Sequence, residues 1–232
     1  MRKISPDGVW NDFAAQLDEQ FAYYQSSWNT LKGADDRKIA TENYILTIGV
    51  MFEGYVNDLV FAYANRDCSK VMQHLENSLR ACLQTVPKAE AAFNKFGDFK
   101  QRDHLTKSDL KEILDPEGRN TSFPDFASIE DRANQWLASA HAQKFTNLSA
   151  QQRAVINAAI AARNNLAHRS KSSLDRLNVV FNAGALHPTG LKRNVNLIQQ
   201  AGHYLKARPN NGDSRAIILG RLLRNASEAL VH

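Results

Sequence analysis

The sequence predicts an all-α helical bundle formed by a single domain over residues 1–232. Three observations support this fold class. Residues that favour helices dominate the composition, the chain holds only 11 Gly and 6 Pro, and apolar residues recur every three or four positions along most of its length. With 43% hydrophobic residues, the chain can bury one sizeable core. No internal repeat, low-complexity tract or long linker divides it.

The first quarter of the chain predicts two long helices. Residues 9–31 carry apolar side chains at helical spacing, and Gly33 marks the end of this helix. Residues 36–64 form the second and longest helix. Gly49 and Gly54 within it each cost about 1 kcal/mol relative to Ala, so we expect another helix to pack closely there.

The middle of the chain is less regular. Residues 69–96 predict one or two shorter helices with a break at Pro87. Residues 97–127 form a long irregular insertion, in which Thr106 and Asp109 have the spacing that begins one short helix. A segment of this kind either covers or gates another part of the molecule, or it is mobile.

Helix resumes over residues 128–145, and a central helix follows. Ser149 and Gln152 have the spacing of a capping box, which begins this central helix. Its apolar stripe is wide, which indicates a helix surrounded by others rather than one at the surface. The stripe comprises Val155, Ile156, Ala159, Ile160, Ala162, Leu166 and Ala167.

The last part of the chain predicts further helices. Residues 177–182 fit a strand or a helix, and a helix is favoured because no partner strand is evident. Pro188 begins another helix, with Val195 in its apolar stripe. Residues 208–213 form a turn, and Asp213 is expected to cap the final helix.

The net charge of +5 is unevenly distributed. Residues 1–138 hold 16 Lys and Arg against 21 Asp and Glu, whereas residues 139–232 hold 13 against 3. A basic half of this kind indicates a surface that binds a polyanion. The alternatives are a solvated basic face without a ligand, or an attraction between the two halves that helps to hold the fold together.

The cysteines and the apolar stretches of the sequence indicate the cellular compartment of the protein. Cys68 and Cys82 lie outside any CxxC motif, which predicts buried or inert thiols in a reducing compartment. The N-terminus resembles no signal peptide, and the longest apolar stretch, residues 44–60, is interrupted by polar and charged side chains. We therefore expect a cytoplasmic protein that does not bind a membrane.

Residues 162–170 carry most of the functional information. Arg163 places a permanent cation five positions before His168, a side chain that titrates near neutral pH. A guanidinium binds phosphate oxygens, and an imidazole takes a proton from a sugar hydroxyl or returns one, so the pair fits chemistry on a phosphodiester without a metal. The chain has no P-loop, dinucleotide-binding, HExxH or zinc-ligand motif. No cofactor or metal is predicted.

The spacing of the two residues sets a geometric condition. On an ideal helix Arg163 and His168 are about 140° apart, so they reach one site only if the helix ends or bends between them, or if each meets its counterpart on a second subunit. Asn164 lies four positions before His168 and is expected to orient the imidazole. Arg169 and Lys171 follow directly and are expected to contact flanking phosphates of the ligand.

Glu53 is a further candidate, because its neighbours at helical spacing are mostly apolar. A carboxylate in such a place is either paired with a cation or carries a raised pKa. The alternatives are a carboxylate at the rim of the domain that faces water, or an ion pair between subunits.

The Arg163-x4-His168 arrangement, with polar Asn164 directly after the arginine, resembles the Arg-x4–6-His signature of the HEPN superfamily, the higher eukaryotes and prokaryotes nucleotide-binding domains. The size and the first two helices are similar to prokaryotic members found in toxin–antitoxin and anti-phage defence loci. The resemblance implies a metal-independent endoribonuclease. In that chemistry the ribose 2′-hydroxyl attacks the adjacent phosphate and leaves a 2′,3′-cyclic phosphate and a 5′-hydroxyl, which restricts the substrate to RNA.

The resemblance also implies residue roles and partners. Arg163 would stabilise the charge on the phosphate, His168 would transfer protons, and Asn164 would position them. Glu53, within residues 52–55, is similar to an acidic position on an early helix of the family, and would tune His168 or hold Arg163. HEPN proteins are typically dimers, which implies a homodimer with a composite active site. An antitoxin or a nucleotidyltransferase-like protein is a candidate partner.

Some HEPN proteins are not enzymes. The alternative is therefore a non-catalytic helical module that binds RNA or a protein partner, with residues 97–127 as the docking segment. Both hypotheses predict affinity for RNA. Only the ribonuclease predicts that His168→Ala abolishes cleavage while it leaves binding largely intact.

Overall fold

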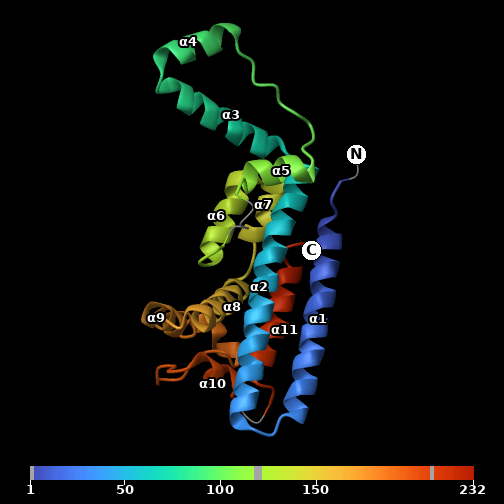
Figure 1. Ribbon diagram of the computed structural model, residues 1–232, viewed down its shortest axis with the longest axis vertical. Coiled ribbons are helices and arrows are strands. Elements are labelled where there is room, and N and C mark those ends of the chain that lie inside the picture. Colours follow the sequence, from blue (N-terminus) through green and yellow to red (C-terminus); the bar gives the residue numbers. More distant parts are fainter. Residues whose placement is uncertain (1–2, 118–121, 210–211) are drawn as a thin grey trace.

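The computed structural model describes residues 3–117, 122–209 and 212–232 (Figure 1). Every regular element within these ranges is a helix, which confirms the all-α prediction. In chain order the elements are α1 (Pro6–Thr30), α2 (Ala34–Arg66), α3 (Ser69–Gln84), α4 (Pro87–Phe96), α5 (Lys107–Leu114), α6 (Phe126–Trp136), α7 (Ser139–Thr146), α8 (Ala150–His168), α9 (Lys171–Val180), the 3₁₀ helix η1 (Gly184–Thr189), α10 (Ala201–Lys206) and α11 (Arg215–Glu228).

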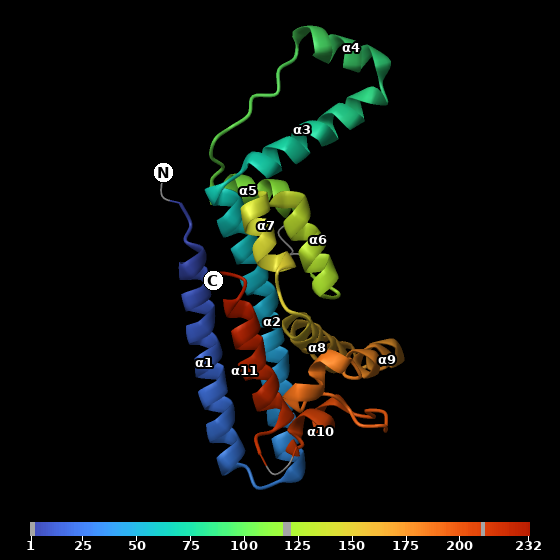
Figure 2. The same ribbon diagram turned by 180° about the vertical axis from the view of Figure 1, so that it is seen from behind.

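The long helices α1, α2 and α11 form the main bundle (Figures 1 and 2). α1 and α2 run antiparallel, and α11 packs along both. Phe13 of α1 stacks on Tyr55 of α2 with ring centroids 4.4 Å apart. The Tyr55 hydroxyl donates to the carbonyl of Ser227 at 2.8 Å, and that of Tyr63 donates to the carbonyl of Leu230 at 2.7 Å. These bonds satisfy buried polar groups and attach the end of the chain to α2.

α2 is the central helix of the bundle. By length and composition alone it is apolar enough to cross a membrane, with a mean hydropathy of 1.4 over its most apolar window. However, 61% of that window is buried inside the fold. α1, α8, α10 and α11 all pack against α2, so its apolar side chains find their partners within the protein.

α3 and α4 form a hairpin that projects from the end of α2 (Figures 1 and 2). The predicted break falls at Pro87, which begins α4. α3 buries only Val71 and Met72, and α4 buries no side chain. Of the two thiols predicted to be buried or inert, Cys68 is buried, whereas Cys82 is exposed because nothing covers this part of the hairpin.

The predicted insertion over residues 97–127 contains the one expected short helix, α5. Thr106 Oγ1 accepts a hydrogen bond from the Asp109 amide at 3.1 Å, and Asp109 Oδ2 accepts one from the Thr106 amide at 2.8 Å, which confirms the predicted capping box. Phe123 is only 2% exposed and attaches the last part of the segment to the core. Residues 118–121 lie outside the described residues.

The single helix predicted over residues 128–145 is in fact two. α6 is followed by Leu137, whose extended backbone (ψ 144°) ends the helix. Leu137 is 1% exposed, so the break directs this side chain into the core before α7 begins.

The prediction of a helix that begins at Pro188 is wrong. Hydrogen bonds to a side chain elsewhere in the fold take the place of helical hydrogen bonds in this segment. Pro188 lies inside η1, and residues 190–200 have no regular structure. The side-chain amide of Asn178 accepts from the amide of Ile198 at 2.7 Å and donates to its carbonyl at 3.0 Å. Val195, expected in a buried stripe, is 96% exposed.

The N-cap of α11 is Ser214 rather than Asp213. Ser214 Oγ accepts a hydrogen bond from the amide of Ile217, whereas the Asp213 carboxylate pairs with Arg221. Serine and aspartate are nearly equal as caps, so the sequence alone did not discriminate between these neighbours. The predicted turn over 208–213 includes residues 210–211, which lie outside the described residues.

Candidate functional site

α8 is the packed element that carries the arginine and the histidine. Ser149 Oγ accepts from the Gln152 amide at 3.2 Å, and Gln152 Oε1 accepts from the Ser149 amide at 2.8 Å, so the predicted capping box begins this helix. α8 packs against α2, α9 and α11, and Ile156 and Ala162 are fully buried. The predicted central position is therefore confirmed. Side chains on such an element are held more rigidly than side chains on a loop.

α8 ends at His168, where the chain turns directly into α9. Arg169 adopts a left-handed conformation (φ 49°), the only positive φ of a residue other than glycine in the described part of the chain. This conformation costs roughly 1–2 kcal/mol for a residue with a Cβ. Ser170 Oγ then accepts from the Ser173 amide at 3.2 Å and caps α9. The helix thus ends directly after His168, and not between Arg163 and His168.

A pocket of about 540 Å³ brings Arg163, Asn164 and His168 together. One chain therefore brings both residues to one pocket, although α8 continues from Arg163 to His168 and the expected break between them is not found. The turn into α9 and the end of the insertion complete the polar lining, with Ser122, Asp125, Ser170, Ser172, Ser173 and Arg176.

Arg163 is held at this pocket by two acceptors. Its Nη2 donates to Glu53 Oε2 at 2.8 Å, and its Nη1 donates to Asn164 Oδ1 at 2.8 Å. The Arg163 and Glu53 side chains are 22% and 15% exposed. A guanidinium has five N–H donors, so donors remain for a ligand after these two bonds. Of the alternatives for Glu53, the structure shows a carboxylate paired with a cation of the same chain.

The close approach of α2 and α8 occurs at this ion pair. A Cβ added to Gly49 would lie 2.6 Å from the Cβ of Arg163, whereas a Cβ added to Gly54 would meet nothing within 4 Å. The predicted close packing is confirmed at Gly49 and wrong at Gly54. Because Gly49 lacks a side chain, the base of Arg163 can lie directly against α2.

The Glu53–Arg163 pair sits in a partly desolvated place. Burial raises the pKa of the Glu53 carboxyl, and the positive charge of Arg163 only partly offsets this effect. One carboxylate faces one guanidinium, so the pair adds no excess negative charge that would repel a phosphate.

His168 lines the pocket and is exposed. Asn164 was expected to orient the imidazole of His168. In the structure, the side-chain oxygen of Asn164 instead accepts a hydrogen bond from Arg163. A hydrogen bond from a charged donor is stronger than one from a neutral donor, so Asn164 fixes the arginine instead.

Arg176 is the pocket residue that sequence reasoning missed. It lies on α9, and its Nη2 donates to Asp125 Oδ2 at 3.1 Å. No motif marks this arginine. The available signal was Ser170 as an N-cap, which would have placed the start of α9 directly after His168 and Arg176 within its second turn.

The two expected phosphate contacts after the motif do not line the pocket. Arg169 Nη2 donates to Glu42 Oε2 at 3.4 Å, and Lys171 Nζ donates to Asp175 Oδ2 at 2.8 Å. The Arg169 and Lys171 side chains are 76% and 88% exposed. Exposed ion pairs of this kind are weak, so both cations can exchange their partners for a ligand on the outer surface.

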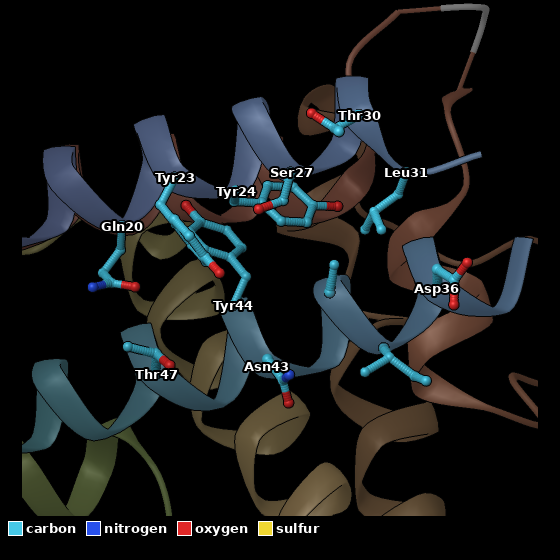
Figure 3. A pocket seen from close by; sticks show the side chains of 12 residues that line it. Gln20, Tyr23, Tyr24, Ser27, Thr30, Leu31, Asp36, Asn43, Tyr44 and Thr47 are labelled. Carbon is cyan, nitrogen blue, oxygen red and sulfur yellow. The ribbon is translucent and has the colours of Figure 1, made fainter. Parts of the chain in front are cut away.

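A separate pocket of about 450 Å³ lies between α1 and α2 (Figure 3). Tyr24 and Tyr44 stack within it at a centroid distance of 4.5 Å, and Tyr23 is 72% exposed at its edge. Its described lining holds no Lys, Arg or His, and Asp36 is its only carboxylate. It lacks the cation and the proton-transfer group that phosphodiester chemistry needs.

The fold and the site together define an all-α domain with an arginine–histidine pocket where α8 meets α9. Among the described residues, no group of three or more His, Cys, Asp or Glu is placed to hold a metal ion. In comparisons with protein families, curated proteins and solved structures, no match to this chain was found. The function is therefore inferred from the chemistry of the pocket.

Proposed function

We propose that the protein is a metal-independent endoribonuclease of the cytoplasm, with the pocket between α8 and α9 as its active site. The observation that carries the proposal is that Arg163 and His168 line the same pocket, with a half-buried guanidinium and an exposed imidazole. A fixed cation beside an imidazole that can take and return a proton is suited to attack on a phosphodiester. The resemblance of the motif to the HEPN signature supports the same chemistry.

The proposed reaction uses the 2′-hydroxyl of RNA as the nucleophile. His168 takes the proton of this hydroxyl, its oxygen bonds to the adjacent phosphorus, and the bond from phosphorus to the 5′-oxygen breaks. The proton returns to the leaving 5′-oxygen from the imidazolium, directly or through water. Arg163 binds the non-bridging oxygens and stabilises the charge that develops on them. The products are a 2′,3′-cyclic phosphate and a 5′-hydroxyl.

The other pocket residues position Arg163 or the RNA and take no part in bond making or breaking. Glu53 and Asn164 are positioning residues, because both accept hydrogen bonds from Arg163. Arg176 and the serines of the turn into α9 are further donors for phosphate oxygens next to the reacting one.

The proposals for partner proteins and for the biological role rest on the resemblance to the HEPN superfamily. We propose a homodimer because HEPN proteins are typically dimers. The second copy would add a facing Arg–His pair to a pocket that is already lined by Arg163 and His168 of one chain. A toxin–antitoxin or anti-phage defence role, with an antitoxin or a nucleotidyltransferase-like protein as partner, belongs to the same proposal.

The test is cleavage of a mixed RNA pool in EDTA by the wild type, Arg163→Ala, His168→Ala and His203→Ala. His203 is an exposed histidine on α10 outside the pocket, so its variant is the matched control. We expect wild type and His203→Ala to produce cyclic-phosphate ends, and each pocket variant to lose about 10²–10⁴-fold in rate. Cleavage that survives in both pocket variants would remove this pocket from the mechanism.

The second candidate is a non-catalytic module that binds RNA. It is favoured by one observation: within the described residues His168 makes no hydrogen bond that would fix which ring nitrogen carries the proton. RNA binding without cleavage by any of the four proteins would support this candidate over the ribonuclease.

A further inference from the structure

A second pocket, of about 810 Å³, lies at the opposite end of α9. The basic side chains of its lining are His187, Lys192, Arg193 and Arg215, and none of the described lining residues is Asp or Glu. Two asparagines add amide donors. The composition of the lining is that of a site for an anion.

The two arginines of this basic pocket keep their charge uncompensated. Both are half-buried, and both are held by backbone carbonyls: Arg193 Nε donates to Asn178 at 2.9 Å, and Arg215 Nε donates to Gly190 at 3.3 Å. Arg215 also lies over the ring of Tyr204, 4.4 Å from its centroid. Neither takes part in the ion pairs found among the described residues. Carbonyls orient a guanidinium without cancelling its charge, so a bound anion would neutralise it.

The two pockets flank the same helix. The first turn of α9 lines the Arg163–His168 pocket, whereas Arg193 contacts the last turn of α9 through the carbonyl of Asn178. α9 has 10 residues and is therefore about 15 Å long. Residues 190–200 run beside α9 on the side of the molecule away from α1 (Figures 1 and 2). A chain of phosphates a few nucleotides long spans this distance.

We propose that the basic pocket is a second phosphate-binding site, which holds a single RNA strand that runs along α9 from the arginine–histidine pocket. The choice of RNA as the ligand rests on the proposed function. Lys192 and the two arginines bind phosphates of the strand, and Val195, 96% exposed at the pocket, offers an apolar surface to the bases. A strand bound at both ends of α9 enters the proposed active site in one direction.

The test measures binding of a labelled ten-nucleotide single-stranded RNA in EDTA at several salt concentrations. All proteins carry His168→Ala, so that the RNA stays intact. Lys192→Gln is the test variant, because Lys192 makes no hydrogen bond or ion pair with the residues that the structure describes. Lys88→Gln on the exposed hairpin removes the same charge far from both pockets and is the matched control.

We expect Lys192→Gln to bind several-fold more weakly and to lower the slope of log K against log salt by about 0.7, the value for one phosphate contact on a single strand. Lys88→Gln should leave both quantities unchanged. A dinucleotide, which has one phosphodiester, should bind both variants equally, because it reaches only one pocket. Equal losses in the two variants, or no change of slope in Lys192→Gln, would overturn the proposal.

Cleavage by proteins that retain His168 separates this proposal from the proposed function. Cleavage of the ten-nucleotide RNA that is insensitive to Lys192→Gln would leave the ribonuclease in place and remove the second site. A salt slope that depends on Lys192, without cleavage by the wild type, would keep the second site and remove the ribonuclease.

Discussion

The motif helix α8 and the hairpin of α3 and α4 both carry apolar residues at helical spacing, but they lie in opposite environments. In α8, Ile156 is fully buried beneath the neighbouring helices. In the hairpin, α4 buries no side chain and Phe96 is 80% exposed. The spacing of apolar residues therefore predicted a helix in both regions, but it did not predict that the apolar side chains of the hairpin would stay uncovered.

The comparison also separates the region that carries the proposed active site from one that is only loosely attached. Arg163 is fixed because the helix beneath it is packed on several sides and because Glu53 meets it from α2. The hairpin has few buried contacts, which places it at the low end of local stability. The proposed active site is thus built on the rigid region.

The largest expected effect is on the free energy of unfolding, and it is tested by replacing one apolar side chain in each region. Ile156→Ala should lower the free energy of unfolding by about 2–5 kcal/mol, because it leaves a cavity in the core. Phe96→Ala should change it by less than about 0.5 kcal/mol, because the ring is largely exposed. Urea unfolding followed by circular dichroism measures both. A similar loss in the two variants would mean that the hairpin packs as tightly as α8.

A smaller effect, with opposite signs, is expected at two glycines of α2. Gly49→Ala should destabilise the fold by about 1–3 kcal/mol, because the new methyl group overlaps the base of Arg163. Gly54→Ala should stabilise it by about 0.5–1 kcal/mol, since its methyl group meets open space and alanine favours the helix. Thermal melts of both variants measure the signs. Stabilisation by Gly49→Ala would contradict the close crossing of α2 and α8.

The smallest effect is a pH dependence that differs between the two regions. The pKa of Glu53 is raised from 4.5, chiefly by burial, so its contribution to stability is present at low pH and is lost as the pH rises through the raised value. Glu53→Gln stays neutral, and its stability should therefore improve relative to the wild type as the pH rises above about 4.5.

Glu76 on α3 is the control, because its pKa is shifted in the opposite direction to that of Glu53. Hydrogen bonds from Arg80 and Gln101 lower the pKa of Glu76 below 4.5, so its contribution is present above that value and is lost as the pH falls. Glu76→Gln should lose stability relative to the wild type as the pH rises through the same region. Denaturant midpoints at pH 4 and pH 7 measure both variants, and parallel trends would contradict the assigned shifts.

Local signals in the sequence were sufficient for many boundaries. The capping boxes at Thr106 and Ser149 and the break at Pro87 all appear where the residue types require them. The prediction failed at Pro188 because the side chain of Asn178, far away along the chain, holds Ile198 in an irregular segment. Such a bond competes with helix formation, and it produces no periodic pattern of residues in the sequence from which it could be predicted.

By itself the sequence determined that the chain is helical, that α8 is a central helix and that an arginine and a histidine lie at its end. Only the tertiary structure decided that both line one pocket, because the left-handed Arg169 ends α8 at His168 and turns the chain into α9. It also decided that Glu53, 110 residues before Arg163, is the partner of that arginine. Periodicity and capping depend on neighbours within a turn or two, whereas these pairings depend on how distant helices pack.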